Sequence, residues 1–211
     1  MNKDPFIKEC KRINIEITEE QIEKLNMFYN LMIEWNEKIN LTRIIEEKEV
    51  YLKHFYDSLT LNKVVNLKEV NTLCDVGTGA GFPGIVLKIV FPNLKITLID
   101  SLQKRVKYLN EIIKKLELNN IEAIHSRGEN YKGKYDVVTS RAVANIEKLV
   151  DYTMHLVSKE GIFVAMKAKI ENELTKEVRN IIEKKYIIIK EEKFNLPIEQ
   201  SERTLLVIKN K

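Results

Sequence analysis

A glycine-rich run carries the clearest chemical signal in the sequence. It reads Asp75-Val76-Gly77-Thr78-Gly79-Ala80-Gly81-Phe82-Pro83-Gly84 and directly follows a short apolar segment. Glycines at the carboxyl end of a strand let the backbone approach a bound ligand closely. Phe82 stands where a dinucleotide-binding loop needs a small residue, and no Gly-Lys-Ser/Thr follows as a P-loop requires. We therefore predict a loop for a cofactor that carries an ammonium group, bound near Asp75 and Gly79.

A second candidate is Asp100, which ends the next apolar segment about 20 residues after the loop. A carboxylate at that place can accept hydrogen bonds from the two hydroxyls of an adenosine ribose. The alternative is that Asp100 caps a helix that starts near Leu102. Arg127-Gly128-Glu129 follows the third apolar segment and would place a small residue and a carboxylate near an adenine.

The elements that must position these residues are short strands that alternate with helices. Five strands are expected in βαβ order, which predicts an α/β fold with a parallel sheet, and two more without a helix-length gap predict a C-terminal antiparallel hairpin. The expected strands are Thr72–Val76, Lys95–Asp100, Ile121–His125, Tyr135–Ser140, Gly161–Lys167, Tyr186–Phe194 and Thr204–Lys209.

The first third of the chain is expected to be helical, because it has no glycine from Phe6 to Leu67. Apolar residues recur at helical spacing between residues 22 and 39, and Thr18 with Gln21 forms a capping-box start. A further helix is predicted from Glu46 to Lys63, with its apolar side chains facing inward. We expect an N-terminal helical cap over residues 1–66 and a sheet domain over residues 67–211.

Composition limits the class of protein. The 211 residues are 44% hydrophobic and 31% charged, and no apolar run reaches the ~18 residues that span a bilayer. The only cysteines, Cys10 and Cys74, favour a reducing compartment and no Cys-rich metal site. We expect a cytoplasmic protein, a monomer, with no membrane partner and no metal. The net charge of +4 is too small to identify a partner.

Further segments, taken in order with this loop, resemble those of a known family. They are Trp35-Asn36-Glu37-Lys38-Ile39-Asn40-Leu41-Thr42, His54-Phe55-Tyr56-Asp57-Ser58, Asp100-Ser101-Leu102-Gln103-Lys104-Arg105 and Ser140-Arg141-Ala142. The chain resembles, over nearly its whole length, the bacterial GidB family of small-subunit ribosomal RNA guanine-N7 methyltransferases, which use S-adenosylmethionine.

The resemblance implies a Rossmann-like class I methyltransferase: a seven-stranded, mostly parallel sheet with a C-terminal antiparallel hairpin and an N-terminal helical cap. It implies that Gly77 and Phe82 lie against the methionine and adenosine parts of S-adenosylmethionine. Gly128 and Glu129 would flank the adenine, and Arg141 would lie near the cofactor or the incoming base. The family often has Gly after the fifth strand, where this chain has Ala168, so no special backbone is expected there.

The residues after the fourth strand bear on the acceptor atom. Enzymes that methylate an exocyclic amine often carry an acidic residue or Asn there, followed by Pro-Pro and an aromatic, whereas this chain reads Thr139-Ser140-Arg141-Ala142. This favours a ring nitrogen. Guanine N7 has a free lone pair and loses no proton, so no general base is expected and catalysis depends on orientation and on a field that tolerates positive charge.

Several side chains are candidates for contact with small-subunit ribosomal RNA or the small-subunit particle. Asn40 and His54 would form a wall for an unstacked guanine. Ser140 is a candidate because it adjoins Arg141. Candidates for contact with RNA phosphate are Lys167, Arg203 and, more weakly, Lys104, Arg105 and Lys107. For the last three, the alternative is a solvated helix face.

The spacing of His54, Asp57 and Ser58 places them on one helical face. They could form either a structural network or a nucleophile triad. Alternatives left open are a small-molecule or protein acceptor and a non-catalytic RNA-binding ribosome-assembly module. An NAD-dependent oxidoreductase is disfavoured by Phe82.

Overall fold

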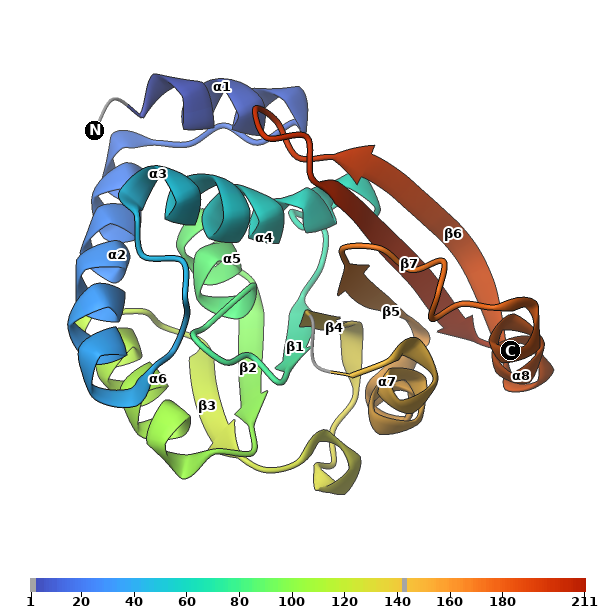
Figure 1. Cartoon of the computed structure of the whole chain (residues 1–211). Helices are drawn as coiled ribbons and strands as arrows, with labels where there is room; N and C mark the ends of the chain where they lie inside the picture. The colour runs from blue at the N-terminus through green and yellow to red at the C-terminus, as the bar shows by residue number, and fades with distance from the viewer. Residues whose placement is uncertain (1–2, 142–143) are drawn as a thin grey trace.

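Seven strands form one sheet in the computed structural model, which describes residues 3–141 and 144–211 (Figure 1). The strands are β1 (Thr72–Val76), β2 (Lys95–Asp100), β3 (Ile121–His125), β4 (Tyr135–Arg141), β5 (Val157–Lys167), β6 (Tyr186–Asn195) and β7 (Glu202–Asn210). Their order is β3-β2-β1-β4-β5-β7-β6. The first five are parallel and β7 is antiparallel to both its neighbours, as predicted.

Helical segments surround the sheet. They are α1 (Asp4–Arg12), α2 (Glu19–Ile39), α3 (Glu47–Val50), the π-helix η1 (Tyr51–Tyr56), α4 (Asp57–Leu59), the 3₁₀ turn η2 (Thr60–Lys63), α5 (Gly84–Val90), α6 (Gln103–Lys115), the 3₁₀ turns η3 (Gly128–Asn130) and η4 (Met154–Leu156), α7 (Ile146–Thr153) and α8 (Lys176–Lys185). α1 was not among the predicted helices.

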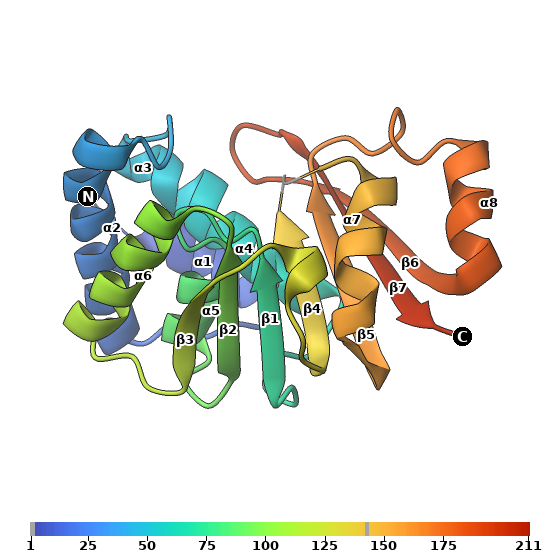
Figure 2. The ribbon, with the colours of Figure 1, turned by 90° about the horizontal axis from the view of Figure 1, so that it is seen from below.

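The sheet has a core on each face. The larger one includes buried side chains of α2, η1, α5 and α6, and the smaller one includes those of α7 and α8. Figure 2 shows α7 and α8 on the face turned away from the N-terminal helices. Three rings join the cap to the glycine loop: the Phe28 centroid lies 5.7 Å from that of Phe55 and 5.5 Å from that of Phe82. Residues 3–66 therefore share a core with the sheet.

The start of α2 is as predicted. The Thr18 side chain accepts from the Gln21 N–H at 3.2 Å, and the Gln21 side chain accepts from the Thr18 N–H at 3.0 Å. This capping box satisfies two backbone donors that the first helical turn leaves free. The helix ends at Asn40, whose left-handed backbone (φ +51°) turns the chain toward the second helical stretch.

The second stretch is helical from Glu47 to Lys63 but is not the single regular helix predicted. Its middle, Tyr51–Tyr56, is a π-helix, and its end is a 3₁₀ turn. The Ser58 hydroxyl donates to the carbonyl oxygen of His54 at 2.6 Å, which gives one carbonyl of this widened turn a partner. The apolar side chains predicted to face inward, Val50, Phe55, Leu59 and Leu61, are fully buried.

The expectation that a helix fills every gap between the parallel strands is wrong for residues 126–134. This connection between β3 and β4 contains only η3, because it is too short for a helix of ordinary length. Hydroxyl groups lie over the sheet where a helix would pack: Tyr135 donates to Thr97 at 3.0 Å and lies 3.2 Å from the Tyr131 oxygen.

We expect the cap and the sheet to unfold together, because they share one core. Trp35, the only tryptophan, belongs to α2 and contacts Tyr108 of α6 at 5.7 Å between ring centroids. Urea unfolding followed by its fluorescence and by far-ultraviolet circular dichroism should give coincident midpoints. Phe28→Ala should lower the free energy of unfolding by about 3–5 kcal/mol in both signals. A Trp35 transition at lower urea than the dichroism would show that residues 1–66 unfold separately.

Candidate cofactor and substrate site

The glycine loop and the end of β2 lie side by side at the carboxyl edge of the sheet. β1 and β2 pair in register from Thr72 with Lys95 to Val76 with Ile99, so the loop begins level with Asp100. Three glycines of the loop have left-handed backbones, with φ of +74° at Gly77, +60° at Gly79 and +92° at Gly81. These conformations explain why glycine is needed at these positions.

Asp75 supports the loop from below. It is fully buried, and its Oδ2 accepts from the Gly84 N–H at 2.9 Å. Burial raises its pKa to about 6, against the lowering effects of this hydrogen bond and of the Thr78 side chain. The Thr78 hydroxyl itself is buried and makes no hydrogen bond of normal geometry. In this structure Asp75 holds the loop, and its predicted contact with the cofactor stays a prediction.

Asp100 connects the loop to the start of α6. Its Oδ2 accepts from the Gly79 N–H at 2.9 Å, and its Oδ1 accepts from the Leu102 N–H at 2.9 Å. Arg105 lies 3.4 Å from Oδ2. The helix begins one residue after Leu102, so Asp100 holds the turn before the helix and is not its N-cap residue. A carboxylate accepts about four hydrogen bonds, and three donors already bond to Asp100, which leaves capacity for about one ribose hydroxyl.

Gly128 and Glu129 lie in η3, just beyond β3. Gly128 is buried, and a Cβ there would meet Val76 Cγ1 at 2.7 Å and the Tyr152 carbonyl oxygen at 3.3 Å. Only glycine therefore fits this close approach of the backbone to β1. Glu129 is exposed, and its nearest cation, on Arg127, is 3.9 Å away.

On the other side of the loop, Phe82 packs against the cap. The His54 ring is stacked on the Phe82 ring with centroids 4.4 Å apart and an interplanar angle of 20°. The guanidinium of Arg141 lies 5.1 Å from the centroid of the same ring. The Phe82 ring is therefore covered by His54 from the π-helix and by Arg141 from β4, and only 4% of the residue is exposed.

Arg141, at the end of β4, is bound by the cap. Its Nη1 donates to the Lys53 carbonyl oxygen at 3.2 Å and to Asp57 Oδ2 at 3.1 Å, and its Nη2 donates to His54 Nδ1 at 3.1 Å. A guanidinium has only donors, so His54 Nδ1 must be an acceptor. The ring proton is then on Nε2, which donates to the Thr42 hydroxyl at 3.0 Å.

His54 is consequently neutral. Burial, and secondly the positive charge of Arg141, lower its pKa to about 3. Both ring nitrogens are engaged, so His54 cannot act as a base without a rearrangement of the cap. Ser58 donates its hydroxyl to the His54 carbonyl oxygen and not to the ring, which supports the structural alternative for His54, Asp57 and Ser58.

A pocket of about 260 Å³, lined by both charged and apolar side chains, lies next to Arg141. The Asp57 carboxylate at its wall binds two guanidiniums, Arg141 through Oδ2 and Arg203 of β7 through Oδ1, the latter at 3.0 Å. Lys53 and Lys167 complete the basic lining. Lys167 is paired with Glu173 at 2.7 Å and also donates to the Ala144 carbonyl oxygen, whereas Lys53 is paired with Glu49 and Glu199.

The structure does not bring all predicted substrate residues to this pocket. Asn40 is exposed and does not line it. The Ser140 hydroxyl is buried and donates to the Val76 carbonyl oxygen at 2.7 Å. Lys104 and Lys107 are exposed on α6. Ala142, the last residue of the Ser-Arg-Ala segment, lies outside the described residues.

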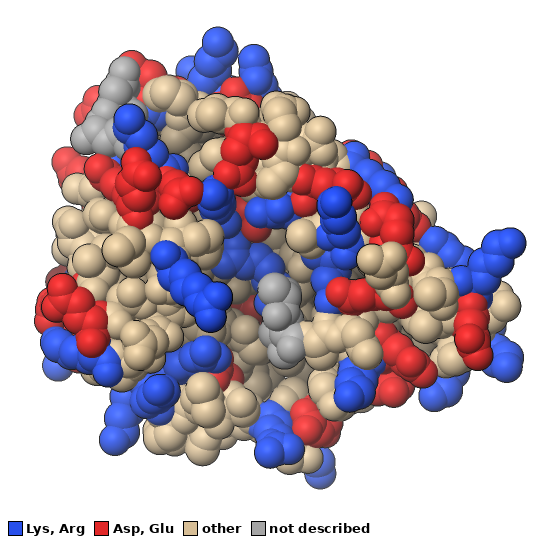
Figure 3. Space-filling model, viewed as in Figure 1, with Lys and Arg blue, Asp and Glu red and all other residues tan. Residues whose placement is uncertain are grey.

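Sequence reasoning missed two residues of this region. Lys53 lines the pocket, and the signal that could have indicated it is its position next to His54 on the same helical segment. Leu102 has 42% of its surface exposed directly after Ser101, at the edge that holds Asp100. The position of Leu102, two residues after the ribose candidate, was visible in the sequence, but its exposure was not. Figure 3 shows Lys and Arg side chains around a central hollow on this face.

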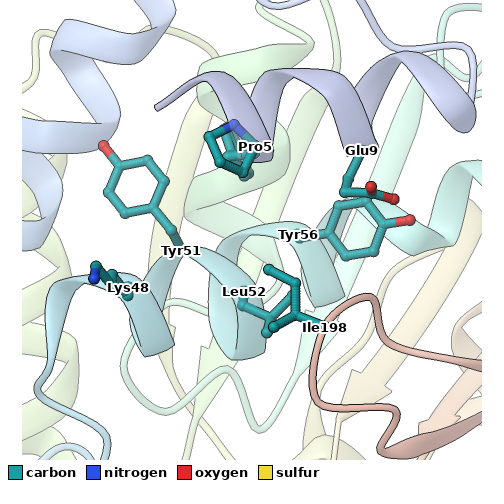
Figure 4. A pocket seen from close by; sticks show the side chains of 8 residues that line it. Pro5, Glu9, Lys48, Tyr51, Leu52, Tyr56 and Ile198 are labelled. Carbon is teal, nitrogen blue, oxygen red and sulfur yellow. The ribbon is translucent and has the colours of Figure 1, made fainter. Parts of the chain in front are cut away.

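A second hollow, of about 480 Å³, lies on the opposite side of the π-helix (Figure 4). Its lining is mostly apolar and comes from α1, Tyr51, Tyr56 and the hairpin loop at Ile198. The described residues contain no group of three or more side chains that could hold a metal ion. No helix within residues 3–141 and 144–211 is long and apolar enough to cross a membrane.

Comparisons with known proteins agree with this geometry. Residues 21–205 match the family model described as rRNA small subunit methyltransferase G. A protein of that name from Lactobacillus helveticus is 46% identical over 218 residues, which cover 99% of this chain and 91% of the relative. Another, from Bacillus subtilis, is 43% identical over 216 residues, covering 99% and 90%.

Solved structures show the same fold at low sequence identity. StiE O-MT residues 961–1257 superpose with a TM-score of 0.63 at 13% identity, covering 84% of this chain and 81% of that one. The ribosomal protein L11 methylase from Lactobacillus delbrueckii subsp. bulgaricus gives a TM-score of 0.57 at 16% identity, covering 79% and 80%. The predicted Rossmann-like methyltransferase fold is confirmed.

We expect His54 to stay neutral, with its proton on Nε2, between about pH 5 and pH 8, where an ordinary histidine titrates. The unfolded chain binds the proton near 6.5 and the folded chain near 3, so the free energy of unfolding should fall as the pH drops through this window. Nitrogen-15 NMR of the three histidines should show one constant Nδ1 acceptor signal, absent in His54→Gln. Titration of that signal near pH 6.5 would refute the assignment.

Proposed function

The chain belongs to the rRNA small subunit methyltransferase G family, and on that premise we propose that it transfers a methyl group from S-adenosylmethionine to N7 of a guanine in small-subunit (16S) ribosomal RNA. One observation carries the proposal: the glycine loop, Asp100 and a basic pocket beside Arg141 lie at the same edge of the sheet. The acceptor would be the RNA or the small-subunit particle, and the enzyme would act in the cytoplasm as a monomer.

The carboxyl edge has the features that S-adenosylmethionine needs. A Cβ at Gly79 would meet no atom closer than the Gly77 carbonyl oxygen at 3.9 Å, so space is open above the loop. Asp100 retains acceptor capacity for the ribose, and exposed Leu102 offers an apolar surface for the adenine. Gly128 and Glu129 would border the adenine, and Asp75, Gly77 and Phe82 would lie on the methionine side. The cofactor would supply an electrophilic methyl group.

The surroundings of Arg141 favour an acceptor that needs no deprotonation. His54 is neutral with both nitrogens bonded, and both Asp57 oxygens accept from guanidiniums. The hydroxyls of Thr139 and Ser140 donate to backbone carbonyls. Among the described residues that line the pocket, no side chain is placed as a free general base. Guanine N7 fits this environment, since its lone pair is available without proton loss.

Catalysis would then consist of alignment and charge control. The guanine must leave its stack to reach the cofactor, and the pocket next to Arg141 is the space that could receive it. Holding the N7 lone pair in line with the methyl group converts a bimolecular encounter into an oriented one. Asp57 would moderate the positive field of the two guanidiniums as positive charge develops on the base.

Small subunits from a strain that lacks this enzyme should gain a single 7-methylguanosine when incubated with the purified protein and S-adenosylmethionine. Nucleoside digestion and mass spectrometry measure the modification, and naked ribosomal RNA and a protein lysate serve as parallel acceptors. Transfer to the lysate but not to RNA or subunits would favour a protein or small-molecule acceptor. Cofactor binding without any transfer would favour an RNA-binding assembly module.

Asp100→Asn should weaken S-adenosylmethionine binding by about 10–100-fold, the effect of one hydrogen bond to a charged group. Calorimetry measures the dissociation constant, and thermal unfolding tests whether the variant remains folded. Asp151→Asn is the matched control, because Asp151 is exposed on α7 and does not line the loop. Equal affinity in the two variants would remove Asp100 from the cofactor site.

A further inference from the structure

We propose that the RNA strand next to the target guanine follows a groove along the amino end of β7, and that Arg203 binds a phosphate of that strand there. This inference rests on the proposed function and deepens it, because it assigns the path of the substrate beyond the pocket beside Arg141.

The groove is formed by two adjoining hollows. One is the pocket of about 260 Å³ beside Arg141, and the other is a wider hollow of about 680 Å³ over the hairpin loop and the turn after β5. The two hollows share Ala168 and Arg203 in their lining. The wider one continues past Lys169 and Ser201. A strand that places one nucleotide in the pocket can therefore continue outward past Arg203.

Arg203 is held ready for an anion. Its Nε donates to Asp57 Oδ1 at 3.0 Å, and its Nη1 donates to the Glu202 carbonyl oxygen at 2.8 Å and the Ser201 hydroxyl at 3.2 Å. Its Nη2 makes no hydrogen bond to any residue within the described ranges, so two N–H donors are unused. The side chain is 18% exposed. A guanidinium fixed in this way binds a phosphate at a lower entropic cost than a freely moving one.

The charge balance at Arg203 differs from that of the other cations in the groove. Lys167 is paired with Glu173, and Lys53 is paired with two glutamates. The two arginines share the single Asp57 carboxylate, so neither has an ion-pair partner of its own among the described residues. The two glutamates on Lys53 balance the remaining formal charge, so a phosphodiester would bind through the unused Nη2 donors of Arg203 and not through an excess of positive charge.

The position of Arg203 separates it from the cofactor. In the sheet order, β7 lies beyond β5, whereas the loop, Asp100 and Gly128 follow β1, β2 and β3. Arg141, on β4, lies between the two groups. An anion bound at Arg203 is therefore on the acceptor side of the site and is not the carboxylate of the cofactor.

Arg203→Gln tests the assignment, with Arg179→Gln as the matched control. Arg179 is also an ion-paired arginine, 2.6 Å from Glu191, but it belongs to α8 and lines neither hollow. In methylation of small subunits, Arg203→Gln should raise KM about tenfold, as for one hydrogen bond between charged groups. Its RNA binding should lose about 0.7–0.9 from the slope of log affinity against log salt concentration. Affinity for S-adenosylmethionine should stay unchanged in both variants.

Arg203→Lys separates a phosphate contact from a structural role. It keeps the charge, so it should restore the salt slope while it recovers only part of KM. An unchanged KM and salt slope in Arg203→Gln, in a preparation whose wild type methylates subunits, would overturn the inference and leave the proposed function intact. A loss of cofactor affinity in Arg203→Gln would also overturn it. A wild type without activity would instead contradict the proposed function.

Discussion

The guanidinium of Arg141 is the contact on which the arrangement of the site depends. It extends from the last residue of β4 into the cap and donates to the Lys53 carbonyl oxygen, Asp57 and His54. Because it can only donate, each partner has to accept, which determines the tautomer of His54. Because His54 is also stacked on Phe82, the position of the His54 ring affects that of the glycine loop as well. Cofactor loop, strand and cap are thus joined through one side chain.

The proposed reaction makes two opposed electrostatic demands on the site. Binding of RNA requires positive charge, whereas the proposed methylation of guanine N7 would place a positive charge on the base, which nearby guanidiniums disfavour. Asp57 is buried between Arg141 and Arg203 and reduces the net charge of the pair to one. A neutral His54 adds none. The net charge of +4 for the whole chain gives no sign of this local arrangement, in which two guanidiniums share one carboxylate.

Local patterns in the sequence were sufficient for the strands and for the start of α2. Apolar runs bounded by turn residues predicted β1, β2 and β3 to the residue, and the Thr18 capping box needs only residues three apart. The π-helix could not be predicted, because the side chain that bonds the Lys53 carbonyl and the ring stacked on His54 come from distant segments. The bonds from Asp57 to Arg141 and Arg203 join three regions far apart in the chain, so sequence reasoning identified the basic residues without their shared partner.

The short connection between β3 and β4 has a mechanical consequence. Residues 126–134 carry Gly128 and Glu129 at one end and enter β4 at the other, and β4 in turn ends at Arg141. Because no crossover helix intervenes, the backbone joins the residues proposed to border the adenine directly to the central strands. The cap contacts this edge through the side chains of Arg141, His54 and Phe82. We therefore expect a movement that admits or releases a ligand to displace the cap more than the sheet edge.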